Sequence, residues 1–161
     1  MIVSNLNNAI IEDITQPLEY DSISVDTQKV IYNLLRKNID YSFVANIHRG
    51  NPYSLQYRTE YPYIIIPVPL RDENRNRINK CMKRVVMGIQ IEVHTKDEQG
   101  EHTAAEIIDK IAAVFNNNLQ VFRDYHLFHY NLDNMTPPKL TFVEGMFYYV
   151  GKISIHVEWG T

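Results

Sequence analysis

The sequence predicts a single α+β domain over residues 1–161, with an antiparallel or mixed β-sheet and two or three helices packed mainly on one face. The chain has the length of one domain, and its 45% of apolar residues can supply one core. Segments with a helical apolar period and segments with strand-like alternation both occur. Their order is helix, helix, β-hairpin, strand, basic loop, strand, helix and two or three strands, which favours this class.

Two helices are expected before the first strand. Apolar residues recur at every fourth position near the N-terminus, at Ile2, Leu6, Ile10 and Ile14. This spacing predicts a helical extension within residues 1–20, which Pro17 ends. A second helix is expected over residues 27–37, because Asp26 suits an N-cap. An apolar stripe follows it at Val30, Ile31, Leu34 and Leu35.

Four strands are expected next. Alternation over residues 41–48 and 53–57, with turn residues between them, predicts a β-hairpin. The apolar run at residues 64–66 is typical of a strand buried on both faces, and the prolines around it restrict it to an edge or to a few residues. Strict alternation of apolar and polar residues over 85–94 predicts an amphipathic strand.

Residues 71–84 form the one conspicuous charged segment. Its basic residues are Arg71, Arg75, Arg77, Lys80, Lys83 and Arg84. Six positive and two negative charges give this segment +4, so the rest of the chain, whose total is −3, carries −7. We interpret the segment as a long solvated loop between two strands, either kept soluble by its charge or serving as a docking arm for an acidic neighbouring surface. In the second interpretation the six basic residues are the predicted interface. Nucleic-acid contact is disfavoured, because the segment lacks aromatic residues that stack on bases.

The remaining chain predicts one helix followed by strands. A helix is expected over residues 104–116, with a capping box at 103–106 and a wide apolar stripe. The aromatic-rich stretch 121–130 is expected to be β-structure, and the proline pair at 137–138 is expected to break the chain. A closing hairpin is expected to turn at residues 144–145.

The sequence lacks the motifs of catalytic, cofactor and metal sites. The single cysteine, Cys81, allows no intramolecular disulfide, favours folding in a reducing cytoplasm and is interpreted as an incidental loop residue. The six histidines do not follow metal-ligand spacings, and the six glycines are too scattered to cradle a phosphate. We therefore expect no enzyme activity, no cofactor and no bound metal.

Charge and hydropathy also bear on partners. The net charge of −3 disfavours general attraction to nucleic acid or to an anionic membrane. No apolar run approaches the ~20 residues that a spanning helix needs. We expect neither a membrane nor a sequence-specific nucleic acid as a partner, and no signal peptide at the N-terminus.

The order of elements resembles that of the tail terminator proteins, also called tail completion proteins, of long-tailed bacteriophages. In that family a helix precedes a sheet, and a later helix crosses the sheet between strands. The segments that carry the resemblance are residues 30–35, 61–66, 85–95, 104–111 and 152–158. Together they are spread over most of residues 25–160.

The resemblance implies a structural virion protein without catalytic residues. Such a protein forms a homohexameric ring on the last ring of the tail tube, stops tube polymerisation and offers a docking surface to the neck or head connector. The implied partners are further copies of the chain, the tail tube protein and the connector. The implied location is the tail–neck region of the virion, after synthesis in the host cytoplasm.

Two other classes stay open at this point. Another head–tail joining protein, a connector or a stopper, would have a similar size and a similar lack of chemistry. A small ligand-binding or enzymatic α+β domain is the second, and it would use the histidines and tyrosines near residues 125–130.

Overall fold

The computed structural model describes residues 14, 18–39, 44–50, 61–72, 77–78, 83–96, 100–143 and 146–160. Its helical elements are a short 3-10 helix, η2 (Tyr20–Ser22), and the helices α1 (Ile23–Asn38), α3 (Gly100–Asn117) and α4 (Leu119–Asp124). Its strands are β1 (Asn46–Arg49), β2 (Tyr63–Ile66), β3 (Leu70–Arg71), β4 (Arg77–Ile78), β5 (Lys83–Lys96), β6 (Leu127–Val143) and β7 (Met146–Gly160).

Within the described residues the strands form one mixed, seven-stranded sheet in the order β1-β2-β5-β7-β6. β1 and β2 run parallel, and every other neighbouring pair is antiparallel. The short strands β3 and β4 also pair with β5, on the edge that β2 occupies. β5 and β7 form the regular centre of the sheet, because their pairing continues without a register shift from Arg84 opposite Gly160 to Lys96 opposite Tyr148.

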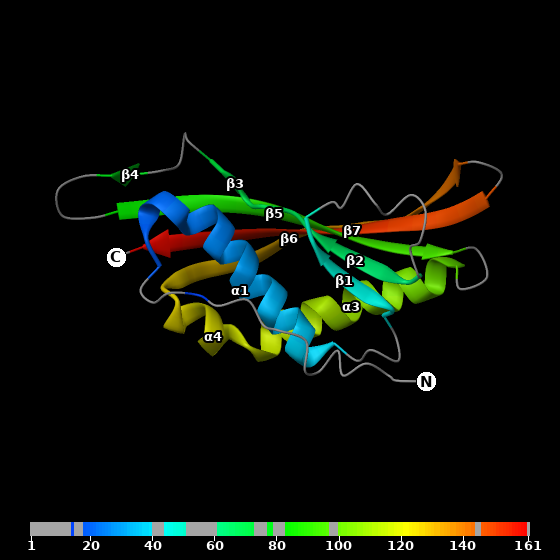
Figure 1. The fold of residues 1–161 in the computed structure, drawn as a ribbon, viewed down its shortest axis with the longest axis horizontal. Coiled ribbons are helices and arrows are strands. Elements are labelled where there is room, and N and C mark those ends of the chain that lie inside the picture. Colours follow the sequence, from blue (N-terminus) through cyan, green and yellow to red (C-terminus); the bar gives the residue numbers. More distant parts are fainter. Residues whose placement is uncertain are drawn as a thin grey trace.

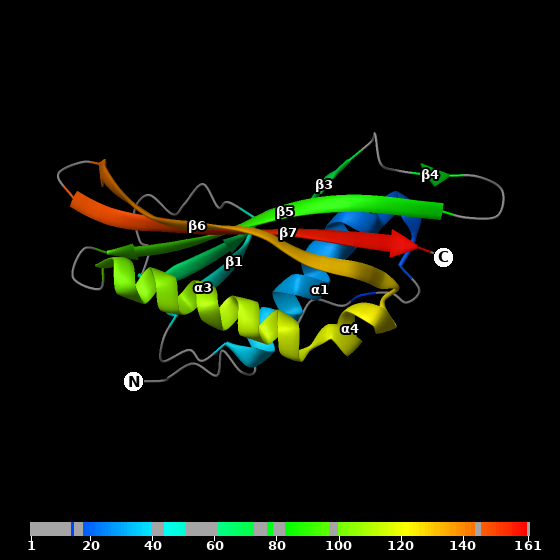
Figure 2. The ribbon, with the colours of Figure 1, turned by 180° about the vertical axis from the view of Figure 1, so that it is seen from behind.

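The helices α1, α3 and α4 all lie on one side of this sheet (Figures 1 and 2). The odd-numbered residues of β5 and β7 point toward them, and those from Val85 to Val93 are buried. The core joins sheet residues to both long helices through Met87, Ile91, Ile153, Ile31, Leu35, Ile107 and Ile111. The predicted α+β class, with helices on one face of a mixed sheet, is confirmed.

Helix α1 contains the predicted second helix but begins earlier, at Ile23. Ser22 stands at the N-cap position, and its hydroxyl donates a hydrogen bond of 2.6 Å to the Asp26 carboxylate. Asp26 therefore lies in the first turn, where a carboxylate suits the positive end of the helix dipole. The expectation that Asp26 caps the helix is wrong, but the predicted stripe at residues 30–35 is buried.

Helix α3 likewise begins earlier than expected, at Gly100, which has a φ of 59°. The Thr95 hydroxyl, at the end of β5, donates a hydrogen bond of 3.1 Å to the Gly100 carbonyl and so joins strand to helix. Thr103 lies inside the helix, so the predicted capping box is wrong. The predicted apolar stripe is confirmed, because Ala104, Ile107, Ile108, Ile111 and Phe115 are all buried.

The segment after α3 differs from the sequence prediction. Residues 119–124 form the helix α4, not a strand. Its Phe122 is buried and packs edge-to-face on Phe115, with 5.8 Å between ring centroids. This tertiary contact outweighs the strand preference of the aromatic residues. His126, with a φ of 59°, ends the helical stretch just before β6.

The proline pair at 137–138 does not break the chain as expected. β6 continues through it, with a register shift between Thr136 and Lys139 against β7. Prolines are tolerated there because β6 is the last strand of the described sheet, and the register shift leaves residues 137–138, which have no backbone N–H, without a paired residue on β7. The predicted closing hairpin is confirmed, since Val143 pairs with Met146 across residues 144–145.

The structure also bears on the predictions for the first third of the chain. β2 is buried at all four positions, as predicted, and it lies between β1 and β5 and so is a short central strand. β1 belongs to the predicted hairpin, but its described partner is β2, in parallel. The second strand of that hairpin, at residues 53–57, lies outside the described residues. Of the helical extension expected within residues 1–20, the structure describes only Ile14, which packs against the core, and residues 18–20.

Candidate functional site

The predicted basic interface is divided by the structure into parts with different roles. Arg71 ends β3, Arg77 belongs to β4, and Lys83 and Arg84 begin β5. The expectation of one long loop over residues 71–84 is therefore wrong, because both of its ends are built into the sheet. Arg75 and Lys80 lie outside the described residues, and for Arg77 only the backbone is described.

Arg71 fastens β3 to the start of α1. Its Nη2 donates a hydrogen bond of 2.7 Å to the Tyr20 carbonyl, and its Nε donates one of 3.2 Å to the Ser24 hydroxyl. The guanidinium also lies over the Tyr20 ring, 4.6 Å from its centroid. The Lys83 ammonium lies 5.9 Å from the same centroid. Arg71 therefore has a structural role within its own chain.

Arg84 forms a bidentate ion pair with Glu158 across the central strands. Its Nη2 and Nε lie 2.6 and 3.0 Å from the two carboxylate oxygens of Glu158. The hydrogen bond to Glu158, and then the charge of that residue, raise the pKa of Arg84 above its ordinary value. Arg84 thus joins β5 to β7 near their ends. Like Arg71, it is a predicted interface residue that makes polar contacts within its own chain.

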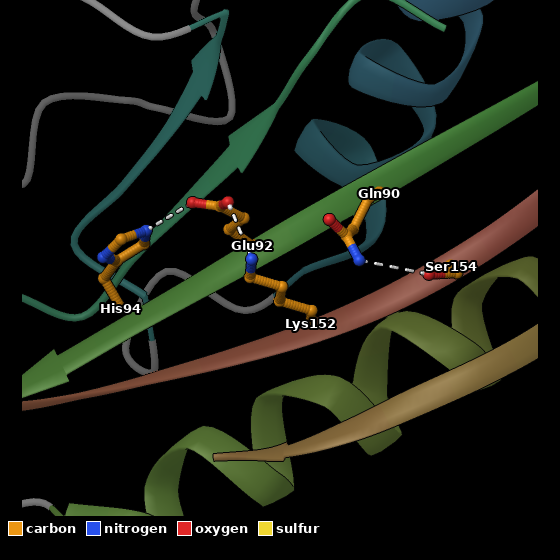
Figure 3. A network of polar contacts seen from close by, with 5 residues as sticks. All are labelled: Gln90, Glu92, His94, Lys152 and Ser154. Atoms are coloured by element: carbon orange, nitrogen blue, oxygen red, sulfur yellow. Dashed lines mark hydrogen bonds and ion pairs between the residues drawn. The ribbon is translucent and has the colours of Figure 1, made fainter. Parts of the chain in front are cut away.

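The other face of β5 and β7 carries a polar network. Their even-numbered residues point away from the helices, and we call this side the open face. Strand register places Gln90 beside Ser154 and Glu92 beside Lys152. Figure 3 shows these side chains together with His94 on the two strands. The alternation of β5, which was predicted, produces this face, whereas the pairing with β7 was not predicted.

Glu92 is the centre of this network. Its two carboxylate oxygens lie 3.0 Å from the His94 Nε2 and 3.7 Å from the Lys152 Nζ (Figure 3). The hydrogen bond with His94 lowers the pKa of Glu92, and the charges of His94 and Lys152 add to this against the opposing effect of burial. Glu92 is therefore held as a carboxylate that bridges two basic side chains of neighbouring strands.

Aromatic rings extend the network toward β2 and β1. The Tyr63 ring stacks on the His94 ring, with 4.6 Å between centroids and 8° between planes. The His48 and Tyr63 rings make an edge-to-face contact. The centroid of the Tyr61 ring lies 5.1 Å from that of the Tyr63 ring. Burial is the main cause that raises the pKa of Tyr63. The pKa of His48 is lowered, first by burial and second by the charge of Arg36. We call Glu92, His94, Lys152, Tyr63 and His48 the open-face cluster.

Sequence reasoning missed the open-face cluster. The histidines were considered only by their spacing along the chain, and His102, eight positions after His94, is exposed on α3. The signal present in the sequence was the even-numbered series on β5, but Tyr63 and Lys152 join it only through strand pairing. Among the described residues, no three His, Cys, Asp or Glu side chains come together in a group that could hold a metal ion. In the same residues, no helix is long and apolar enough to cross a membrane.

No protein-family model matches the chain, and no curated protein matches it either.

Proposed function

We propose that the protein is a structural component of a phage virion, a tail terminator that closes the tail tube. In this role several copies, six by the resemblance, form a ring on the end of the tube, stop its polymerisation and offer a docking surface to the neck or head connector. The protein then needs no active site, cofactor or metal. Its partners are further copies of itself, the tail tube protein and the connector.

The main support is the position of α3 between β5 and the β6–β7 hairpin. It follows β5, crosses one face of the sheet and leads through α4 into β6 (Figure 2). This is the arrangement expected from the resemblance, with an earlier helix, α1, on the same side. The opposite face of the same strands carries the open-face cluster, in which His48, Glu92, His94 and Lys152 are partly exposed while Tyr63 is buried. Surfaces rich in tyrosine and histidine beside charged groups suit protein contacts.

Charge gives a second line of support. The exposed side of α3 carries Glu101, Glu106 and Asp109, with Lys110 as the neighbouring basic residue. The exposed Lys83 and the segment that follows β3 carry positive charge. A side-to-side arrangement that brings the basic segment of one copy near α3 of the next is heterologous, and it closes into a ring when the rotation fits. Each exposed pair contributes only ~0–1 kcal/mol, so several must act together.

Electron microscopy of the purified protein, alone and mixed with tail tubes, tests the proposal. We expect rings of uniform size that cap tube ends, because a terminator must match the symmetry of the tube. Rings that bind portal complexes and leave tube ends bare would instead identify a connector or stopper. A protein that stays monomeric beside tail tubes would rule out the terminator role.

The open-face cluster favours one alternative, a small ligand-binding domain. His48, His94, Tyr61 and Tyr63 gather there, whereas near residues 125–130 His126 is exposed and the side chains of His129 and Tyr130 lie outside the described part of the chain. Binding of a small molecule that is lost in a His94→Ala variant, together with failure to cap tubes, would favour this alternative over a virion role.

A further inference from the structure

The row of aromatic rings on the open face ends in a pair of half-buried tyrosines. The Tyr63 ring, which stacks on His94, is itself buried and contacts the Tyr61 ring. The Tyr61 and Tyr148 rings follow, with 6.4 Å between centroids and 22° between planes. Both of these tyrosines keep part of their surface exposed. Two nearly parallel phenol rings are therefore accessible at one corner of the sheet.

Three lysines surround this pair of rings. The Lys96 Nζ lies 5.1 Å from the centroid of the Tyr61 ring, and strand register places Lys96 opposite Tyr148. Lys139 is exposed, and it pairs with the next residue of β7 that shares a face with Tyr148. Lys152 follows two positions further along the same face of β7. We call Tyr61, Tyr148, Lys96, Lys139 and Lys152 the basic corner.

The charge of the basic corner is opposite in sign to that of the whole chain. Three lysines and the neighbouring Glu92 give +3 − 1 = +2, whereas the chain carries −3. Glu92 already bridges His94 and Lys152 (Figure 3). Glu92 therefore offsets Lys152, and the positive charge of the corner is centred on Lys96 and Lys139.

The basic corner combines residues that lie far apart in the sequence. Nucleic-acid contact was disfavoured for the whole chain by its net charge, and for residues 71–84 by their lack of aromatic residues. The basic corner contains none of residues 71–84, and its members come from the residues before β2 and from β5, β6 and β7. Strand pairing thus places rings beside positive charges, which no local segment of the sequence does.

A ligand for this corner has to combine planar rings with repeated negative charge. A purely acidic peptide would meet the lysines, but it has no planar ring to offer to the tyrosines. A nucleic-acid duplex has phosphates, but its bases are stacked on one another inside the helix. A single strand offers both groups, because its bases stack on aromatic side chains while its phosphates lie along a positive surface.

The layers of the fold suit such a ligand. Every described helix lies on the other side of the sheet, so none of them covers the open face of β5 and β7 (Figures 1 and 2). A sheet whose exposed face carries aromatic residues for base stacking is a common arrangement for binding single strands. We propose that the basic corner binds single-stranded nucleic acid without sequence preference. Bases stack on Tyr61 and Tyr148, and Lys96 and Lys139 bind the phosphates.

The test measures the binding of a fluorescein-labelled oligothymidylate, about 12 nucleotides long, by fluorescence anisotropy at several salt concentrations. The first variant, Tyr148→Leu, removes a ring but keeps an apolar side chain on β7. The second variant combines Lys96→Gln with Lys139→Gln. Its matched control combines Lys37→Gln with Lys110→Gln, which removes the same charge from exposed positions of α1 and α3 on the other side of the sheet. Thermal unfolding checks the fold of each variant, and the lysine variant decides the test if Tyr148→Leu does not fold.

We expect the wild type to bind the oligothymidylate, and Tyr148→Leu to bind it at least about fivefold more weakly, as for the loss of one stacked base. The slope of the logarithm of the binding constant against the logarithm of the salt concentration reports phosphate contacts. Its magnitude should fall by about 0.7 for each of the two open-face lysines that is removed. The control variant should keep the wild-type affinity and slope.

Four results would overturn the proposal. The first is a wild type that does not bind the oligothymidylate at low salt, and the second is a control variant that loses as much affinity as the open-face lysine variant. The third is equally tight binding of duplex DNA, whose bases are not free to stack on the tyrosines. The fourth is displacement of the oligothymidylate by an equal concentration of thymidine monophosphate, which would identify a site for a small nucleotide instead. Ring formation and tube capping are measured separately, so each of these results leaves the proposed function standing.

Discussion

Replacing Ile111 by alanine tests how α3 is held on the sheet. The Ile111 side chain is 0% exposed and belongs to the cluster that joins α3 to β5 and β7. The substitution removes three side-chain carbons, which costs about 2.4 kcal/mol at ~0.8 kcal/mol for each buried carbon. The cavity that remains adds to this loss, so we expect the free energy of unfolding to fall by about 2–5 kcal/mol in total.

Urea denaturation followed by tryptophan fluorescence measures this change. Trp159 is the only tryptophan, and at 3% exposed it reports on the core beside the helices. A loss of this size also lowers Tm by about 4–20 °C, since each kcal/mol shifts Tm by ~2–4 °C in a chain of this length. Lys110→Ala, at an exposed position of the same helix, is the control and should change stability by about 0.5 kcal/mol or less. A loss below about 0.5 kcal/mol in Ile111→Ala would refute the packing of this stripe on the sheet.

Three further predictions follow from the contacts of the sheet. Arg84→Glu should lower Tm, because it replaces the ion pair with Glu158 by a repulsion. A variant with glutamate at Arg75, Arg77 and Lys80 should instead keep the wild-type Tm and lose salt-dependent ring assembly. A similar Tm for the two variants would contradict the different roles given to Arg84 and to these three residues. The pKa of Glu92 is lower in the fold than its ordinary 4.5, so the stabilisation by its carboxylate is present above pH 4.5 and is lost as the pH falls through the lower folded value. The difference in unfolding free energy between the wild type and Glu92→Gln should therefore shrink over that range. A difference that does not change with pH would exclude this contribution of Glu92. Gly88→Ala places a Cβ 3.2 Å from the His156 Nε2. The substitution should therefore lower Tm in the wild type, and should lower it less in a His156→Ala background. Equal losses of Tm in the two backgrounds would exclude a clash with His156.

Local periodicity was enough to predict the main elements. The stripe of α3 and the alternation of β5 each repeat over ten or so residues, and both were confirmed because one face of each element is buried in the core. The hairpin turn at residues 144–145 was also predictable, since turn residues act within a few positions of the chain.

Element boundaries depended on contacts that the sequence pattern does not contain. α3 begins at Gly100, next to a hydrogen bond from Thr95, rather than at the capping box. α4 is a helix beside the buried contact of Phe122 with Phe115. In both places a tertiary interaction of a few residues outweighed local preferences that differ by less than about 1 kcal/mol.

The grouping of charged and aromatic side chains on the sheet was decided by tertiary structure. Arg84 and Glu158 are 74 residues apart in sequence, and only the pairing of β5 with β7 makes them partners. The open-face cluster brings His48 and Lys152 to one face by the same route, through the register of four strands. By itself the sequence determined which residues are apolar, which are charged and which face of each element is buried. Strand register decided which charges meet, because pairing over long sequence separations depends on the whole core and not on any local period.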